Sequence, residues 1–171
     1  PRLLKDAICV EIDNKFQDLS YEISESINIR IVTTKDLDAL HILRHSSAHI
    51  LAQAVLNLYP NAQFGVGPSI ENGFYYDFLF ETPIKENELE NIEKEMKSIA
   101  KSAQSFIRSE ITKKDAVKIF RNQKLKLELI ESAESDEGVG EEIVSTYAND
   151  KFIDLCMGPH VPSTSVLKHF K

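Results

Sequence analysis

The chain has 171 residues, of which 42% are hydrophobic, and a formal net charge of −7. This length allows one medium-sized domain, or one domain with a small additional module. No hydrophobic run approaches the roughly 20 residues that a membrane-spanning helix requires, so we expect no membrane partner. The negative charge argues against a free-standing nucleic-acid-binding protein, because affinity for phosphates comes from clustered Lys and Arg.

The two cysteines, Cys9 and Cys156, lie near opposite ends of the chain. Such a pair does not make a disulfide framework, and it favours the reducing environment of the cytoplasm. The N-terminus lacks the hydrophobic core of a secretory signal. It begins with Pro1 rather than Met, which indicates a processed chain or a fragment.

Alternating hydrophobic residues predict two strands near the N-terminus, at 7–12 and 27–32. Asp13-Asn14 predicts a turn after the first strand. Two strands alone are only marginally stable. We therefore interpret residues 1–35 as part of a small β-rich module that precedes a main domain at 36–171.

The segment 39–58 predicts a long buried helix. Arg44 is its only formal charge, and its hydrophobic residues recur at helical spacing. A helix that is apolar nearly all round is a buried helix. Asp36 or Asp38 can cap its start, and Pro60 stops it.

Two histidines of this helix, His45 and His49, are four positions apart and therefore share one face. They fall on the flank away from the main Leu/Val stripe, beside Ala48 and Ala52. We expect both imidazoles to be enclosed, or to line a cavity next to these small residues.

The middle of the chain predicts a mixture of helices and strands. The expected elements are an aromatic strand at 74–80, a charged helix that opens at Thr82-Pro83, a strand at 106–112, a helix from Thr112 to Phe120 and an acidic solvated loop at 131–142. The pattern does not distinguish helix from strand at 126–130.

Residues 142–156 predict a β-hairpin. On its second strand, Asp154 and Cys156 share one face. A turn at Gly158-Pro159 can return His160 to the side of Cys156. The order of elements predicts an α+β fold, in which an antiparallel sheet is covered by a long buried helix and flanking helices, plus the small partial β-rich N-terminal module.

Four side chains of metal-ligand or catalytic type meet if the hairpin returns to the long helix: His45, His49, Cys156 and His160. This set matches a zinc site, closed or completed by a water. It also matches a metal-free hydrolytic site in which imidazoles position water and move protons. A third possibility is a cysteine nucleophile with a histidine base. The pattern alone does not choose among these sites, and taken singly each histidine is compatible with a packed core residue.

We assign no reaction role to the other candidates in the chain. His41 continues the histidine spacing one turn earlier and is expected at the surface or in a supporting position. His169 is expected to be solvated, and Cys9 to be a small packed residue. The glycines at 65–67 are expected to form a turn rather than a phosphate-binding loop.

Three segments resemble the N-terminal editing domain of bacterial-type threonyl-tRNA synthetases, which belongs to the second additional domain family of tRNA synthetases. They are LRHSSAHILAQAV at 43–55, GVGPSIENGFYYDF at 65–78 and DLCMGPHVPST at 154–164. The HxxxH and Cys-x-x-x-His pairs are shared with the alanyl-tRNA editing family, whereas CMGPH and the middle segment are typical of the threonyl branch. The resemblance runs from about residue 36 to the C-terminus, and residues 1–35 resemble the second half of a ubiquitin-like module.

The resemblance implies that the domain hydrolyses seryl-tRNA(Thr), a mischarged product. Its partners would then be the 3′ end of tRNA(Thr) carrying serine and the remainder of the synthetase chain. The isolated region is too short to contain an aminoacylation core. The alternatives are a structural zinc module and a tRNA-binding module without chemistry.

The resemblance also implies roles for individual residues. It places four site residues around the substrate: His45, His49, Cys156 and His160. Asp154 lies beside them and is expected to pair with the substrate ammonium. Lys126 falls where the family carries a catalytic lysine, with Lys124 as the alternative. The resemblance favours a reaction without metal, although the alanyl branch uses zinc and these four ligands permit it.

Overall fold

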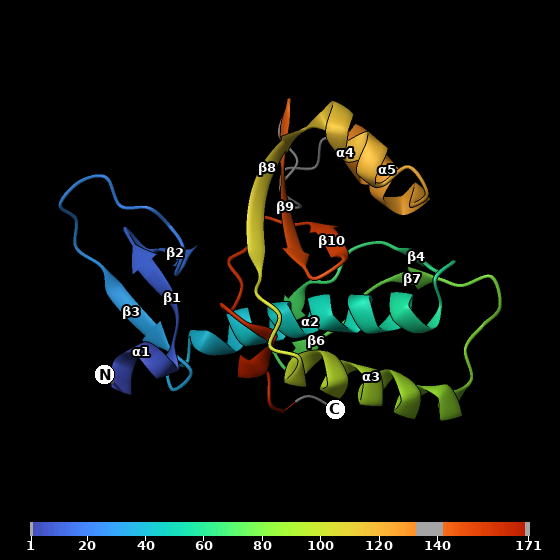
Figure 1. Ribbon diagram of the computed structural model, residues 1–171, viewed down its shortest axis with the longest axis horizontal. Coiled ribbons are helices and arrows are strands. Elements are labelled where there is room, and N and C mark those ends of the chain that lie inside the picture. The colour runs from blue at the N-terminus through green and yellow to red at the C-terminus, as the bar shows by residue number, and fades with distance from the viewer. Residues whose placement is uncertain (1, 133–141, 170–171) are drawn as a thin grey trace.

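The computed structural model describes residues 2–132 and 142–169, and it confirms the α+β fold (Figure 1). The helices are α1 (Arg2–Asp6), α2 (Ala39–Leu58), α3 (Leu89–Lys101), α4 (Lys113–Ile119) and α5 (Lys124–Ser132). The strands are β1 (Ala7–Ile12), β2 (Lys15–Asp18), β3 (Arg30–Thr33), β4 (Gln63–Phe64), β5 (Ser69–Ile70), β6 (Gly73–Phe74), β7 (Phe78–Leu79), β8 (Ile107–Thr112), β9 (Ile143–Asn149) and β10 (Phe152–Leu155).

The first three strands form an antiparallel sheet in the order β2-β1-β3, here called the N-terminal sheet. Asp13 and Asn14 both have positive φ angles, 49° and 61°, as a tight two-residue hairpin turn requires. The predicted first strand and turn are therefore confirmed. The second strand is predicted to start at residue 27, but β3 begins at Arg30. Ile27 and Ile29 are exposed, so the alternating pattern there does not mark a buried face.

Helix α2 is the central element of the fold, and it has the bounds that the sequence predicts. It is buried on most of its circumference, with α3 packed on one side and the β8–β9–β10 sheet on the other (Figure 1). Asp38 occupies the N-cap position, but its side chain does not cap the helix. Its carboxylate instead accepts a hydrogen bond from Arg30 at 2.6 Å, which ties the start of α2 to the N-terminal sheet.

Segment 74–80 is not the continuous strand that the sequence predicts. The chain makes only the two short strands β6 and β7, and between them Asp77 pairs through its backbone with Gly65 and Val66. This pairing leaves the intervening Tyr76 directed into the interior, where its hydroxyl finds a carboxylate. Two short strands therefore replace the predicted one, and Tyr76 between them makes a buried polar contact.

Helix α3 begins later than the sequence predicts, at Leu89 rather than near Thr82. A short 3₁₀ turn at Glu86–Glu88 precedes it, and the Glu88 side chain accepts a hydrogen bond from the Lys85 backbone N–H at 2.7 Å. This local capping sets the start of the helical region. The hydrophobic stripe of α3 is buried as its spacing predicts, through Ile92, Met96 and Ile99.

The second large sheet has the antiparallel order β10-β9-β8, and it confirms the predicted strand at 106–112 and the predicted hairpin. The Thr112 hydroxyl accepts a hydrogen bond from the Asp115 backbone N–H at 3.1 Å, so α4 starts with the expected cap. Residues 126–130 are helical, within α5. Most of the predicted acidic loop, 133–141, lies outside the described residues.

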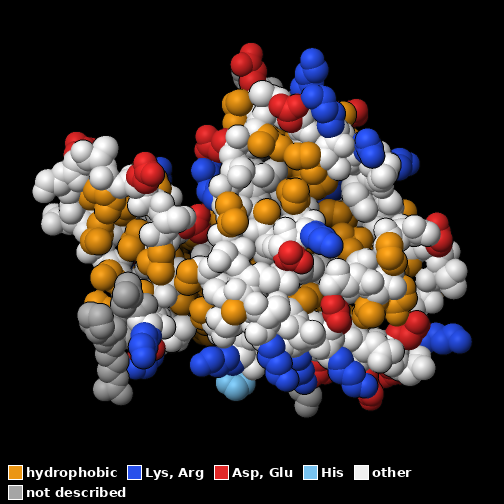
Figure 2. All heavy atoms as spheres, viewed as in Figure 1, with side chains coloured by type: hydrophobic (Ala, Val, Ile, Leu, Met, Phe, Trp, Pro, Cys, Tyr) orange, Lys and Arg blue, Asp and Glu red, His pale blue; other side chains and the backbone are white. Residues whose placement is uncertain are grey.

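The segment that follows β10 runs between α2 and the N-terminal sheet. Its Val161 N–H donates to the Ser46 hydroxyl of α2 at 3.1 Å, and its His160 N–H donates to Asp18 of β2 at 3.0 Å. Within the described part of the chain, no helix is both long and apolar enough to cross a bilayer. Figure 2 shows hydrophobic side chains on the surface of the N-terminal sheet and Lys and Arg side chains along the edge that α3 forms.

Candidate functional site

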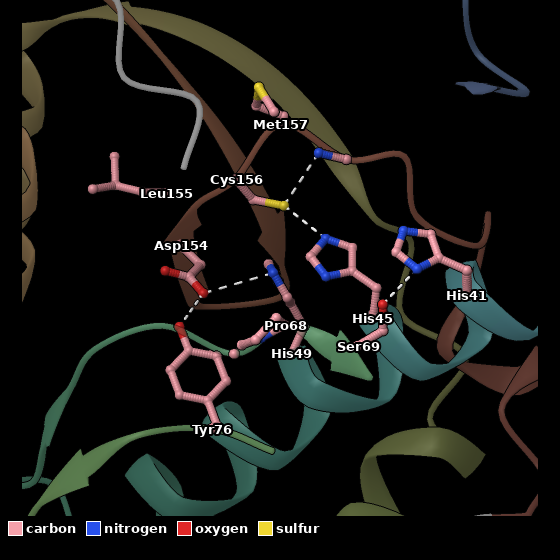
Figure 3. Close-up of a pocket in the computed structure, with 12 residues that line it drawn as sticks. His41, His45, His49, Pro68, Ser69, Tyr76, Asp154, Leu155, Cys156 and Met157 are labelled. Carbon is pink, nitrogen blue, oxygen red and sulfur yellow. Dashed lines mark hydrogen bonds and ion pairs between the residues drawn. The ribbon is translucent and has the colours of Figure 1, made fainter. Parts of the chain in front are cut away.

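A cavity of about 210 Å³ opens between α2 and the end of β10. Figure 3 shows His45 directed from α2 toward Cys156, and His49 directed toward Asp154. The loop around Pro68 forms a further wall of the cavity. The long helix and the hairpin therefore present their polar side chains to one another across this space.

The structure brings together the four side chains that the sequence singles out: His45, His49, Cys156 and His160. Their ligand atoms all lie within 4.8 Å of one another. His45 Nε2 is 3.0 Å from Cys156 Sγ, and Cys156 Sγ is 3.3 Å from His160 Nε2. The rings of His45 and His160 stack with their centroids 4.4 Å apart. We call this set the His/Cys cluster.

The turn after β10 is what returns His160 to Cys156, as its sequence predicts. Gly158 has a φ of 77°, and a Cβ added to it would lie 2.0 Å from the Tyr147 hydroxyl. Glycine is therefore required here both by backbone conformation and by space. The Gly158 N–H also donates to Cys156 Sγ at 3.2 Å, so the turn itself contributes a donor to the cluster.

Burial keeps the three imidazoles of the cluster neutral. It lowers the pKa of His45 to about 3, and the neighbouring His49 lowers it further. Burial also lowers the pKa of His49 to about 3, with a contribution from the charge of Lys126. The pKa of His160 is held well below its ordinary value by burial and by the two other histidines. At neutral pH each ring therefore has a free lone pair, for a metal ion or for a proton.

Lys126 is a fully buried residue rather than a surface lysine. Its Nζ lies 2.5 Å from Asp154 Oδ1 and 3.1 Å from the Tyr76 hydroxyl. Tyr76 in turn donates to Asp154 Oδ2 at 2.5 Å, and His49 Nε2 lies 3.6 Å from the same oxygen. A buried charge pair of this kind needs such additional hydrogen bonds to be stable.

The structure separates the two candidate lysines. Lys124 is exposed over most of its side chain and faces Glu128 at 3.7 Å, away from the cavity. Lys126 is close to the cavity but does not line it, since Tyr76 and Asp154 stand in between. Any effect of Lys126 on a bound molecule therefore passes through Asp154, whose charge it already partly neutralises.

Sequence reasoning missed two residues of the site. The sequence places Tyr76 in an aromatic strand, and the only signal of a polar role is its hydroxyl, which phenylalanine lacks. Ser46 follows His45 directly, and its hydroxyl lies 3.0 Å from His160 Nδ1. This contact orients the His160 ring, whose Nε2 then faces Cys156.

The remaining candidates are placed outside the cluster. His41 is exposed at the rim of the cavity, where its Nδ1 lies 2.6 Å from the Ser69 hydroxyl. His169 is exposed. Cys9 is fully buried in β1, and burial raises the pKa of its thiol to about 12, so it is an inert packed residue.

Comparisons with known proteins identify the chain. Residues 144–171 match the family described as the threonyl and alanyl tRNA synthetase second additional domain. The Threonine–tRNA ligase of Francisella philomiragia is 46% identical over 173 residues, which cover 100% of this chain and 26% of the relative. The corresponding ligase of Ralstonia nicotianae is 45% identical over 99% of this chain and 26% of the relative. The ligase of Thermotoga petrophila is 46% identical over 98% of this chain and 26% of the relative.

The chain corresponds to an N-terminal region of threonyl-tRNA synthetases. It spans about a quarter of the length of these relatives. The family match covers Cys156 and His160, whereas the whole-chain matches also cover His45 and His49. Both halves of the His/Cys cluster therefore lie in sequence shared with synthetases.

The cluster in this synthetase region fits a zinc ion by its chemistry. Zinc prefers a tetrahedral set of imidazole nitrogens and thiolate sulfurs, with ligand bonds of about 2.0–2.3 Å. His49 Nδ1 is buried and has no hydrogen-bond partner among the described residues, as expected of an atom that awaits a ligand. A zinc ion held by three of these four side chains would keep one open position and could supply Lewis-acid chemistry to a group bound in the cavity, whereas one held by all four would be structural.

Proposed function

We propose that this synthetase region edits mischarged tRNA, by hydrolysing the ester of seryl-tRNA(Thr) to serine and tRNA. The observation that carries the proposal is the convergence of His45, His49, Cys156 and His160 within 4.8 Å of one another, with all but His160 lining the cavity. Neutral imidazoles beside a small cavity have a nitrogen lone pair with which to position a water molecule. The relatives are threonine–tRNA ligases, which makes an aminoacyl ester the natural substrate class.

A synthetase for threonine needs such an activity for an energetic reason. Its synthetic site can demand a hydroxyl, but serine keeps that hydroxyl and lacks one methyl group. A difference of one methyl group contributes only about 1–3 kcal/mol to discrimination. A second site that hydrolyses the smaller product restores accuracy, provided that the methyl of threonine prevents a productive pose.

The geometry suggests how the substrate lies. The cavity of about 210 Å³ accommodates an aminoacyl group but not the terminal adenosine as well, so the nucleotide stays at the rim near His41 and Ser69. Asp154 lines the cavity, with Oδ1 held by Lys126 and Oδ2 by the Tyr76 hydroxyl, so the substrate ammonium would share one of these oxygens. This arrangement retains the expected role of Asp154 but makes it a shared one.

In the proposed reaction, His45 accepts a proton from a water molecule as that water attacks the ester carbonyl. The bond between the carbonyl carbon and the ribose oxygen then breaks, and the leaving ribose oxygen takes up the proton that His45 received, so His45 is neutral again. His49 and Cys156 line the cavity and contact the serine amine and hydroxyl, while His160 contacts Cys156 from behind. With His45, these side chains would also hold a metal ion if one binds. Lys126 does not line the cavity, so we assign it to Asp154 rather than to the water.

The test is a deacylation assay in the full-length synthetase with seryl-tRNA(Thr) and threonyl-tRNA(Thr). We expect hydrolysis of the seryl ester only, and a loss of at least about 100-fold in His45→Ala and Cys156→Ala, in the range for removal of a proton-transfer group. Lys124→Ala is the matched control, because that side chain is exposed and lies outside the cavity. Normal deacylation by the His45→Ala/Cys156→Ala double variant would refute the proposal.

A second candidate function is a structural zinc module, in which the four ligands only hold α2 to the hairpin. The ligand distances of the His/Cys cluster favour it. Elemental analysis and a thermal melt with a chelator separate the two functions, because a structural zinc site unfolds when the metal is removed. A binding module without chemistry instead predicts no turnover of seryl-tRNA(Thr) in the full-length synthetase.

A further inference from the structure

One carboxylate of the N-terminal sheet reaches the back of the His/Cys cluster. Asp18, the last residue of β2, is partly buried. Its Oδ1 accepts a hydrogen bond from the His160 backbone N–H at 3.0 Å, and its Oδ2 accepts one from the Tyr147 hydroxyl at 2.5 Å. The two contacts span 142 and 129 positions of the chain, so they join two parts of the fold that are distant in sequence.

Both groups that Asp18 holds touch the cluster directly. The ring of Tyr147 packs edge-on against the ring of His160, with centroids 4.5 Å apart. Phe106 stacks on His160 at 4.7 Å. The Tyr147 hydroxyl also fills the space beside Gly158, where a Cβ would lie 2.0 Å from it. Asp18 therefore fixes both the backbone of His160 and the aromatic ring that sets its position.

A carboxylate is well suited to this position. Hydrogen bonds to an ionised acceptor are shorter and about twice as strong as those between neutral groups. Burial and the negative charge of Asp18 together raise the pKa of Tyr147, so the hydroxyl keeps its proton and remains a donor. Without the carboxylate, a buried hydroxyl and a backbone N–H would both lose their partner.

We propose that Asp18 is a positioning residue for the editing site, through which the N-terminal sheet sets the approach of His160 to Cys156. Its kinetic consequence rests on the proposed hydrolytic function. Asp18 does not line the cavity. Its loss therefore alters the geometry of the reacting groups without removing a contact to the substrate.

The kinetic test uses the full-length synthetase and deacylation of seryl-tRNA(Thr). We expect Asp18→Ala to lower kcat about 10- to 100-fold, the size of effect that a misplacement of about 1 Å produces, with KM changed less than about twofold. Asp18→Asn keeps an acceptor for the His160 N–H and should recover much of the loss. Asp6→Asn is the matched control, since that carboxylate pairs with Lys35 at 3.3 Å, away from the cluster.

Aminoacylation of threonine should be unchanged in all three variants, which shows that the synthetase is folded. A kcat for Asp18→Ala within twofold of the unmodified enzyme overturns the proposal. An increase confined to KM also overturns it, because it indicates a contact to tRNA instead of positioning. If Asp18→Ala fails to fold, Tyr147→Phe decides: it removes one hydroxyl, keeps the ring on His160 and should still lower kcat severalfold.

A second measurement does not depend on hydrolysis. Hydrogen exchange of peptides that cover residues 157–161 should become at least tenfold faster in Asp18→Ala, because the His160 N–H loses its acceptor. Peptides from the middle of α3 should be unaffected. If the unmodified enzyme hydrolyses no seryl-tRNA(Thr), the proposed function fails while exchange still tests the positioning. Unchanged exchange at 157–161 overturns the positioning whatever the activity.

Discussion

His45 Nε2 lies 3.0 Å from Cys156 Sγ, although the two residues are 111 positions apart in the chain. Packing between α2 and the hairpin produces this approach. Ala48 and Ala52 of α2 belong to the same buried cluster as Leu155 of β10. The small side chains allow the strand to come close to the helix, so the distance depends on the hydrophobic core as much as on the two polar residues.

The buried ion pair gives the first prediction, which concerns stability. Lys126→Met should lower the free energy of unfolding by about 3–5 kcal/mol, because it leaves the Asp154 charge buried without its partner. The additional change Asp154→Asn should recover part of the loss, since it removes the uncompensated charge. Urea unfolding of the chain measures both effects. Lys124→Met, at the exposed neighbouring position, should change the free energy by less than about 0.5 kcal/mol.

The second prediction concerns pH and applies to the chelator-treated protein. Burial lowers the pKa of His49 to about 3, whereas an unfolded histidine has its ordinary pKa of 6.5. As the pH falls below 6.5, the unfolded state therefore binds a proton that the folded state does not, and stability is lost down to a pH of about 3. From this histidine alone we expect a loss of about 2 kcal/mol between pH 7 and pH 5.

Urea unfolding at a series of pH values checks this prediction. His49→Gln should show a smaller decrease in stability between pH 7 and pH 5 than the unmodified chain. His169→Gln should behave like the unmodified chain, because His169 is exposed. A decrease that is equally steep in His49→Gln would contradict the assignment of a neutral, buried imidazole at this position.

The third prediction concerns the reactivity of Cys9. Because burial raises the pKa of this thiol to about 12, almost no thiolate forms at pH 8. In a Cys156→Ser variant, iodoacetamide should therefore leave the folded chain unlabelled and should label it once urea has unfolded it. Mass spectrometry of the intact chain follows the reaction. Rapid labelling of the folded variant would mean that β1 is open to solvent.

The fourth prediction concerns the turn after β10. Gly158→Ala should lower the free energy of unfolding by about 1–2 kcal/mol from backbone strain alone, because Gly158 has a positive φ. The new methyl group would also displace Tyr147, so deacylation should fall too. Gly73→Ala is the control, since an added Cβ there meets no atom within 4 Å. Equal stability of the two variants would show that the turn tolerates a side chain.

Sequence patterns predict those parts of this fold that depend on local periodicity. Helix α2 follows from a segment with one charge, and the His/Cys cluster from two pairs of residues with a spacing of four. The same patterns cannot show that Lys126 is buried while Lys124 is exposed, because that depends on which face of α5 packs against the interior. The roles of the site residues and the division at residue 35 remain predictions.

Contacts that depend on tertiary packing were not accessible from the sequence. The buried position of Tyr76 depends on its contact with Asp154, 78 positions away in the chain. The link from Asp18 to His160 joins residues 142 positions apart, and no periodicity signals it. Both are polar contacts of single side chains, for which hydrophobic patterning carries no information.

The arrangement of the His/Cys cluster has a consequence for how the site comes into being. Two of its members leave the ribosome with α2, and the other two follow more than 100 residues later. Until position 160 has been synthesised, the helix carries its histidines without the partners that surround them in the finished fold. A nascent chain that ends before position 160 therefore has no complete site.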